Sequence, residues 1–154
     1  MARLRPSEVR ERVLEEHVAL RKAMEELQQL VVRAEREGDE PARVELKTEC
    51  DGLLRTLHRH LDFEDRLLEP TLRAIDAWGP IRADRLRDDH RAQRRELDRL
   101  AERLGDPANT AGQCAAMVRT FLEWFARDME EEERDILHRE LLRDDAIATN
   151  IFTG

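Results

Sequence analysis

Two pairs of potential metal ligands repeat in the chain with the same spacing. His60 and Glu64 are four residues apart, and Asp128 and Glu132 repeat this spacing later in the sequence. Residues four apart lie side by side on one face of a helix, so both side chains of a pair can reach the same cation. Imidazole and carboxylate together suit iron, manganese or zinc. The spacing therefore indicates metal binding, and no nucleophile or general base is recognisable beside it.

Two single histidines, His17 and His90, precede these pairs, each on an earlier apolar stripe. Each of four predicted helices would then direct a ligand-type side chain into an apolar core, which is costly unless a partner satisfies it. One core histidine alone is more often a hydrogen-bonded structural residue. Together, the positions predict a metal site made of six residues: His17, His60, Glu64, His90, Asp128 and Glu132.

Turn-forming residues divide the chain into the elements that must position these ligands. Gly38 to Pro41, Trp78 to Pro80 and Gly105 to Pro107 interrupt the apolar periodicity. We expect helices at about 7–37, 41–75, 83–104 and 108–142, with Ser7 as the first N-cap. The short connections predict an all-α, up-down-up-down antiparallel four-helix bundle spanning 1–145, followed by a loosely held tail at 146–154.

Composition limits the classes of function. Of 154 residues, 40% are charged and only 4% are aromatic, which is typical of solvated helices, and the net charge of −8 argues against nucleic-acid binding. No apolar run is long enough for a membrane span, and the first six residues lack the apolar segment of a secretory signal. With only two distant cysteines, Cys50 and Cys114, which we expect to be buried and inert, a cytoplasmic location is favoured.

The chain resembles the hemerythrin-like (HHE cation-binding) family over nearly its whole length. His17 matches the ligand of the first helix, His60 and Glu64 match the HxxxE motif, and His90 matches the first histidine of the third helix. Glu132 matches the second bridging carboxylate. The resemblance implies a hemerythrin-like bundle with a dinuclear, oxo- or hydroxo-bridged non-haem iron site, with manganese or zinc as alternatives. It also implies that the site senses, binds or reacts with O2, peroxide or nitric oxide.

Two positions depart from the family pattern. Arg94 replaces the second histidine of the third helix, and Asp128 replaces the histidine of the fourth. Asp128 is shorter than histidine, so it reaches its ion directly, through water, or not at all. We expect His17 and His60 at one iron and His90 with Asp128 at the other. The extra carboxylate favours oxidised iron, so we expect oxidation by O2 rather than reversible carriage.

Other interpretations stay open at the level of sequence. The domain could be a regulatory or protein-interaction module that metal merely stabilises, with a protein partner or a second copy. A ferritin-like oxidase is disfavoured because no Glu-x-x-His occurs. Whether the chain is an enzyme is left undecided. We expect surface positions for His58, His138, Glu130, Glu131 and Glu133, and Arg94 is either a surface residue or the partner of a carboxylate.

Overall fold

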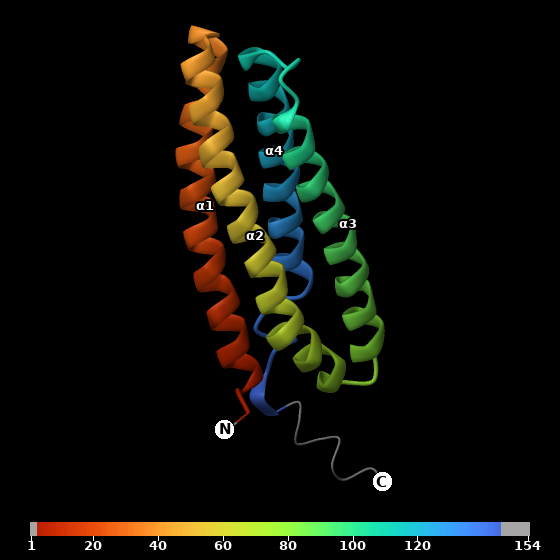
Figure 1. Ribbon diagram of the computed structural model, residues 1–154. Coiled ribbons are helices and arrows are strands. Elements are labelled where there is room, and N and C mark those ends of the chain that lie inside the picture. Colours follow the sequence, from red (N-terminus) through yellow and green to blue (C-terminus); the bar gives the residue numbers. More distant parts are fainter. Residues whose placement is uncertain (1–2, 146–154) are drawn as a thin grey trace.

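The computed structural model describes residues 3–145, which form four long helices joined by short turns (Figure 1). The helices are α1 (Pro6–Glu37), α2 (Glu40–Ile75), α3 (Gly79–Gly105) and α4 (Ala111–Asp135). The all-α four-helix bundle expected from the sequence is confirmed. The tail expected to be loosely held, 146–154, lies outside the described residues. None of the four described helices has a segment long and apolar enough to cross a lipid bilayer.

The helix starts follow from local capping chemistry. The Asp39 side chain accepts a hydrogen bond from the Ala42 backbone N–H at 2.9 Å and caps α2, with Pro41 in the first turn as expected. Thr110 and Gln113 form a reciprocal capping box at the start of α4. This box sets the start of α4 at residue 111, three residues later than the sequence predicted.

Ser7 is not the N-cap of α1, contrary to the sequence prediction. Arg5 occupies that position, and its backbone N–H donates to the Glu8 carboxylate at 2.8 Å. Ser7 lies inside the first turn, where its backbone N–H and its hydroxyl both donate to Asp144, at 3.0 and 2.9 Å. One orphan backbone N–H of the helix start, together with the Ser7 hydroxyl, is thus satisfied from the far end of the described chain.

The last helix is shorter than predicted, since α4 ends at Asp135 rather than near residue 142. Apolar residues of the segment that was predicted to continue this helix are buried after the helix ends. Leu137, Leu141 and Leu142 follow in a turn-rich segment and pack against the first turns of α1 and the end of α2. Apolar periodicity alone could not distinguish this segment from one more helical turn.

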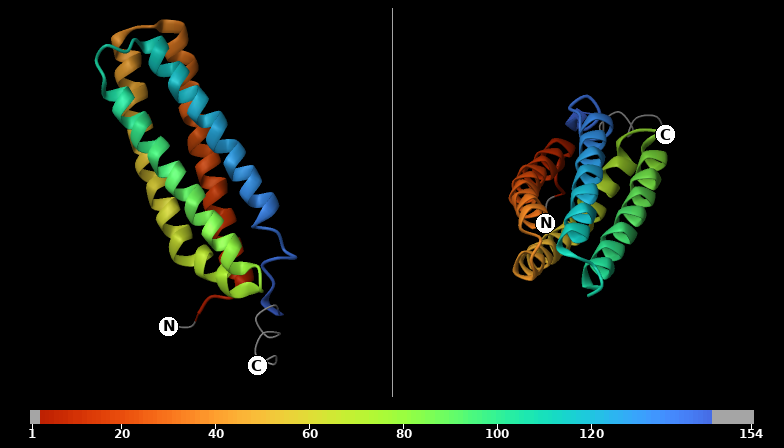
Figure 2. Two further views of the ribbon diagram at one scale, coloured as in Figure 1. Left: turned by 90° about the vertical axis from the view of Figure 1, so that its right-hand side faces the viewer. Right: turned by 90° about the horizontal axis from the view of Figure 1, so that it is seen from above.

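The helices lie along one another in the expected up-down-up-down order, and Figure 2 shows this from two directions. α1 packs mainly on α2 and α4, and α2 packs on α1 and α3. Adjacent α3 and α4 make the fewest contacts among the neighbouring helix pairs. This loosely packed seam matters below because it borders the polar centre of the bundle.

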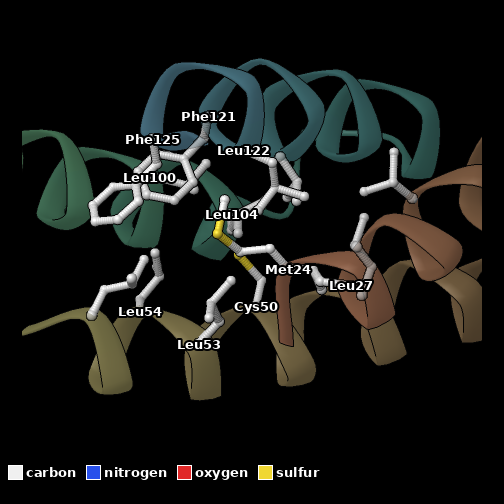
Figure 3. Packing of buried hydrophobic residues seen from close by; sticks show 14 of the residues in the cluster. Met24, Leu27, Cys50, Leu53, Leu54, Leu100, Leu104, Phe121, Leu122 and Phe125 are labelled. Atoms are coloured by element: carbon white, nitrogen blue, oxygen red, sulfur yellow. The ribbon is translucent and has the colours of Figure 1, made fainter. Parts of the chain in front are cut away.

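Two apolar clusters fill the interior, one on each side of a polar layer. The larger cluster gathers residues from all four helices, including Leu100, Phe121 and Phe125 (Figure 3). It also contains Cys50 and Cys114, which are buried; burial raises the pKa of the Cys50 thiol to about 12. The smaller cluster lies at the other end of the bundle. The histidines and glutamates of the predicted site lie between them.

The turn between α2 and α3 depends on a close backbone approach at Gly79. A Cβ atom placed there would overlap the Leu72 carbonyl oxygen and lie 2.8 Å from the Arg73 carbonyl oxygen. Both obstacles are backbone atoms of α2 and cannot swing aside. Gly79 therefore fixes how closely the start of α3 follows the end of α2, which places His90 at the level of Glu64.

Gly79→Ala is expected to lower the free energy of unfolding by roughly 2–3 kcal/mol, because the methyl group displaces backbone rather than a flexible side chain. Gly52→Ala is the matched control. Its Cβ would meet only the Arg55 guanidinium at 3.9 Å, so helix propensity should raise stability by about 0.5–1 kcal/mol. Urea unfolding followed by circular dichroism measures both, and equal effects would refute the close-approach argument.

Candidate metal centre

Five of the six predicted ligands converge in the layer between the apolar clusters. Their nitrogen and oxygen atoms form two groups, and within each group all ligand atoms lie within 4.8 Å of one another. The first group contains His17, His60 and Glu64, and the second contains Glu64, His90 and Glu132. Glu64 belongs to both and therefore lies at the middle of the centre.

The centre is buried and acidic, with Glu64 facing three imidazoles. One Glu64 oxygen lies 2.8 Å from His60 Nε2 and 3.3 Å from His17 Nε2, and the other lies 2.9 Å from His90 Nε2. Glu64 and His90 are fully buried, and His17 is 1% exposed. Glu132 Oε1 lies 3.3 Å from His17 Nε2 and closes the α4 side.

Each imidazole also meets a second carboxylate through its other nitrogen. His60 Nδ1 lies 2.8 Å from Glu16, and His90 Nδ1 lies 2.6 Å from Asp65. A carboxylate on Nδ1 fixes the ring orientation and places the proton there, which leaves the Nε2 lone pair directed at the centre. His17 Nδ1 lies farther from Glu133, at 3.8 Å.

Sequence reasoning missed this outer set, although a local signal exists. Each outer carboxylate is adjacent in sequence to a candidate ligand: Glu16 precedes His17, Asp65 follows Glu64, and Glu133 follows Glu132. Neighbouring residues on a helix point about 100° apart, so the second side chain reaches the seam with the next helix. Glu133, expected at the surface, is instead partly buried and pairs with Arg21 at 2.6 Å.

Arg94 supports the centre from outside. Its guanidinium donates to Asp65 at 2.6 Å and to Asp62 at 2.9 Å. The sequence left Arg94 as either a surface residue or the partner of a carboxylate, and the structure shows that it pairs with carboxylates. The residue that stands in place of a histidine thus orients the carboxylate that holds His90.

Asp128 lies outside both ligand groups. It accepts a hydrogen bond from the Gln93 side chain at 3.1 Å, and burial raises its pKa above the usual value. Asp128, Gln93 and Glu132 line a cavity of about 400 Å³ between α3 and α4, together with Trp124. The shorter aspartate side chain and the glutamine therefore border open space beside the second group.

The residues present fit a bound metal. Among the described residues, four buried side-chain atoms have no hydrogen-bond partner: His17 Nδ1, Glu64 Oε2, His90 Nε2 and Glu132 Oε1. Such atoms are rare in folded proteins; His17 Nδ1 lies on the outer side of its ring, whereas the other three belong to one ligand group, where a bound cation would satisfy them. With protons on the Nδ1 atoms, the Nε2 lone pairs face carboxylate oxygens, and two acceptors repel unless a cation lies between them.

Without metal, protons must lie between these nitrogen and oxygen atoms, and the raised pKa values of His17, His90 and Glu132 reflect this. Burial alone would lower the pKa of His17, but Glu132 and Glu64 raise it to about 9. Burial likewise opposes charge on His90, yet Glu64 and Asp65 raise its pKa to about 8. Burial and the nearby Glu64 charge raise the pKa of Glu132 to about 7.

The metal-free protein is therefore expected to lose stability as the pH rises from about 6 to 9. The pKa of His17 is about 9 in the folded protein and 6.5 in the unfolded chain. Its protonation therefore stabilises the fold fully below pH 6.5, and this stabilisation is lost as the pH rises to about 9. The raised Glu132 pKa acts in the same direction, between 4.5 and about 7. Glu64, with its pKa lowered, stabilises the fold above 4.5 and adds no slope at higher pH.

Melting temperatures of chelator-treated protein across this pH range measure the effect. The metal-loaded protein should show the opposite trend, because protons compete with metal for the same atoms. A melting temperature of the metal-free form that rises toward pH 9 would contradict the proton-for-metal account.

Comparison with known proteins agrees with the geometry. The model of the family described as "Hemerythrin HHE cation binding domain" matches residues 8–139, which covers the four helices apart from the first two residues of α1 and includes every candidate ligand. No curated protein and no solved structure matches the chain. The resemblance noted in the sequence is thereby confirmed, and the match implies that the domain binds metal, for which the buried His/Glu groups are the candidate site. The chain belongs to the hemerythrin HHE cation-binding domain family.

Proposed function

We propose that the centre holds two metal ions, with iron favoured, and that it reacts with O2, peroxide or nitric oxide. The observation that carries the proposal is the position of Glu64, fully buried and shared by two three-residue groups. A single ion in one group would leave imidazole and the Glu64 carboxylate of the other group facing one another without a cation. Iron, when bound, would supply one-electron redox chemistry toward small oxidants.

The residues of the chain divide into roles around this pair of positions. His17 and His60 would serve one position and His90 the other, with Glu64 and Glu132 between them. Asp128, proposed from sequence as a ligand of the second position, would act there through water, since Gln93 holds its carboxylate. The second position would then have fewer protein ligands and more room for an incoming molecule.

The cavity between α3 and α4 supports access for a small ligand. Its volume of about 400 Å³ exceeds what a diatomic molecule or peroxide needs, and Glu132 forms part of its wall. Trp124 also lines it and contacts Phe121 and Phe125, with ring centroids 5.9 and 6.2 Å apart along this cluster. An apolar edge beside a polar wall would admit uncharged gases and limit bulk water.

A second candidate function follows from the energetics of the same layer. A buried layer of imidazoles and carboxylates is costly to an apolar core unless cations neutralise it. Metal could therefore act mainly by completing the fold, so that metal occupancy regulates a binding surface. This is the regulatory alternative raised by the sequence, and it predicts a different response to metal removal.

Metal content of variants tests the ligand assignments. Protein purified without added metal should contain roughly two irons per chain. Glu64→Gln should lose both, because the amide replaces the shared carboxylate, whereas His90→Gln should lose one. Asp128→Asn should keep both, because asparagine can still accept from Gln93. Elemental analysis measures this, with circular dichroism as the control for folding. Loss of one iron in Asp128→Asn would establish Asp128 as a direct ligand.

Metal removal and air oxidation separate the two functions. If the centre is reactive, chelated protein should remain helical, and the anaerobically reduced iron form should oxidise in air without a removable oxygen adduct. Far-ultraviolet circular dichroism and the absorption spectrum report these results. A bundle that melts on metal removal would favour the regulatory candidate, and a long-lived, reversible oxygen adduct would refute the expected oxidation.

A further inference from the structure

A second, larger hollow lies on the same α3–α4 seam and plays no part in the proposed metal chemistry. Its volume is about 700 Å³, and it runs from Ala92 beside Trp124 to Arg103 beside Ala116. Eleven residues of α3 separate its ends, a length of roughly 16 Å, or three helical turns. We call this hollow the seam groove. It shares Ala92 and Trp124 with the cavity beside Glu132.

The floor of the seam groove is apolar. Leu100 on α3 and Met117, Phe121 and Trp124 on α4 form it. Figure 3 shows Leu100 beside Phe121 in the large apolar cluster, whose outer edge the groove exposes. Met117 and Trp124 are only partly buried, so part of this edge lies open to solvent. An apolar strip between two helices is the surface on which a further helix packs.

The rim of the groove is basic in an acidic protein. It carries four arginines, against only two glutamates, in a chain whose net charge is −8. Arg99 pairs with Glu96 at 2.7 Å. Arg95, Arg103 and Arg127 are exposed and form no ion pair with any residue between 3 and 145. Other exposed arginines within the described part of the bundle also lack an ion pair there, so what distinguishes the groove is that four arginines border one apolar strip.

The arginines follow a spacing that a helix can match. Arg95, Arg99 and Arg103 are four residues apart on α3, so their Cα atoms advance by about 6 Å per step. Acidic residues four apart on a second helix advance by the same amount and can face all three. A compact small anion would meet one or two of these charges and leave most of the groove empty.

We propose that the seam groove binds an amphipathic helix of a partner protein that carries acidic residues four apart beside an apolar face. Charge complementarity selects this occupant over others. Residues 146–154 contain no aspartate or glutamate and cannot supply the matching charges. The proposal does not depend on the metal chemistry. It gives the bundle a docking surface whose partner would lie against Trp124, and so beside the cavity at the centre.

An unbiased selection provides the first test. A display library of helical peptides of about 18 residues, long enough to form helix on binding, is selected on the metal-loaded protein. The enriched sequences should carry glutamate or aspartate at every fourth position with leucine or phenylalanine between them. Basic or uncharged consensus sequences would overturn the proposal.

Fluorescence titration of the best acidic peptide provides the second test. In the Trp78→Phe background Trp124 is the only tryptophan, and its emission should change saturably as the peptide binds. Adding R95E/R99E/R103E to this background should weaken peptide binding at least tenfold. High salt should weaken binding of the peptide to the protein that retains the three arginines. The matched control R12E/R55E/R139E reverses three exposed arginines outside the groove and should weaken binding far less.

Each remaining outcome decides the proposal. Equal weakening by the two triple variants would mean that net charge, and not the groove, attracts the peptide. Saturable binding of dodecanoate without binding of the peptide would assign the groove to a small anionic amphiphile. A dimer by light scattering that R95E/R99E/R103E dissociates would assign it to a second copy. Circular dichroism verifies that every variant remains folded, so lost binding cannot be attributed to unfolding.

Discussion

The structure depends on one constraint: hydrogen-bond acceptor atoms face one another in an interior from which water is excluded. Glu16 and Asp65 accept hydrogen bonds from the Nδ1–H groups of His60 and His90, so the Nε2 lone pairs are directed at the carboxylate of Glu64. Lone pair facing lone pair is repulsive, and burial removes the water that would relieve it. Something positive must lie between them. Protons can fill that place, and so can metal ions, which makes the two competitors for one set of atoms.

This constraint shapes the rest of the core. The polar layer separates the interior into two apolar clusters, each of which buries its own leucines and valines. On α1 the change from one cluster to the other occurs at a single residue, since Val13 and Leu20 belong to different clusters and His17 lies between them. The apolar clusters supply the burial that holds the helices together, and the layer determines the register in which they meet.

The fold and most of the centre could be predicted because their signals are local. Proline, glycine and the four-residue spacing are properties of neighbouring positions, and they predicted the bundle and the convergence of His60 with Glu64. The end of α4 could not be predicted, because Leu137 continues the helical periodicity while burying itself in a turn. Whether a buried leucine is helical depends on the residues it packs against, and the apolar periodicity of the sequence carries no information about those contacts.

The placement of Asp128 escaped prediction for a related reason. Its position on the stripe with Glu132 is a property of α4 alone, but its partner, Gln93, belongs to α3. The distance between those two helices is set by their loose packing along the seam. Likewise, the outer carboxylate Asp65 reaches His90 only because α2 and α3 meet at one particular height.

The hydrogen bonds from Ser7 to Asp144 span 137 residues of sequence. Most other contacts between helices join helices that are consecutive in sequence. Pairs of consecutive helices close only short loops and are expected to form early. A long loop closes later because its entropic cost is greater. The centre draws on α1, α2, α3 and α4 together, so no partially assembled hairpin contains the complete set of ligands. The complete set of candidate ligands therefore comes together only once the last helix has docked, and a nascent chain cannot hold a cation in a misassembled intermediate through all of them.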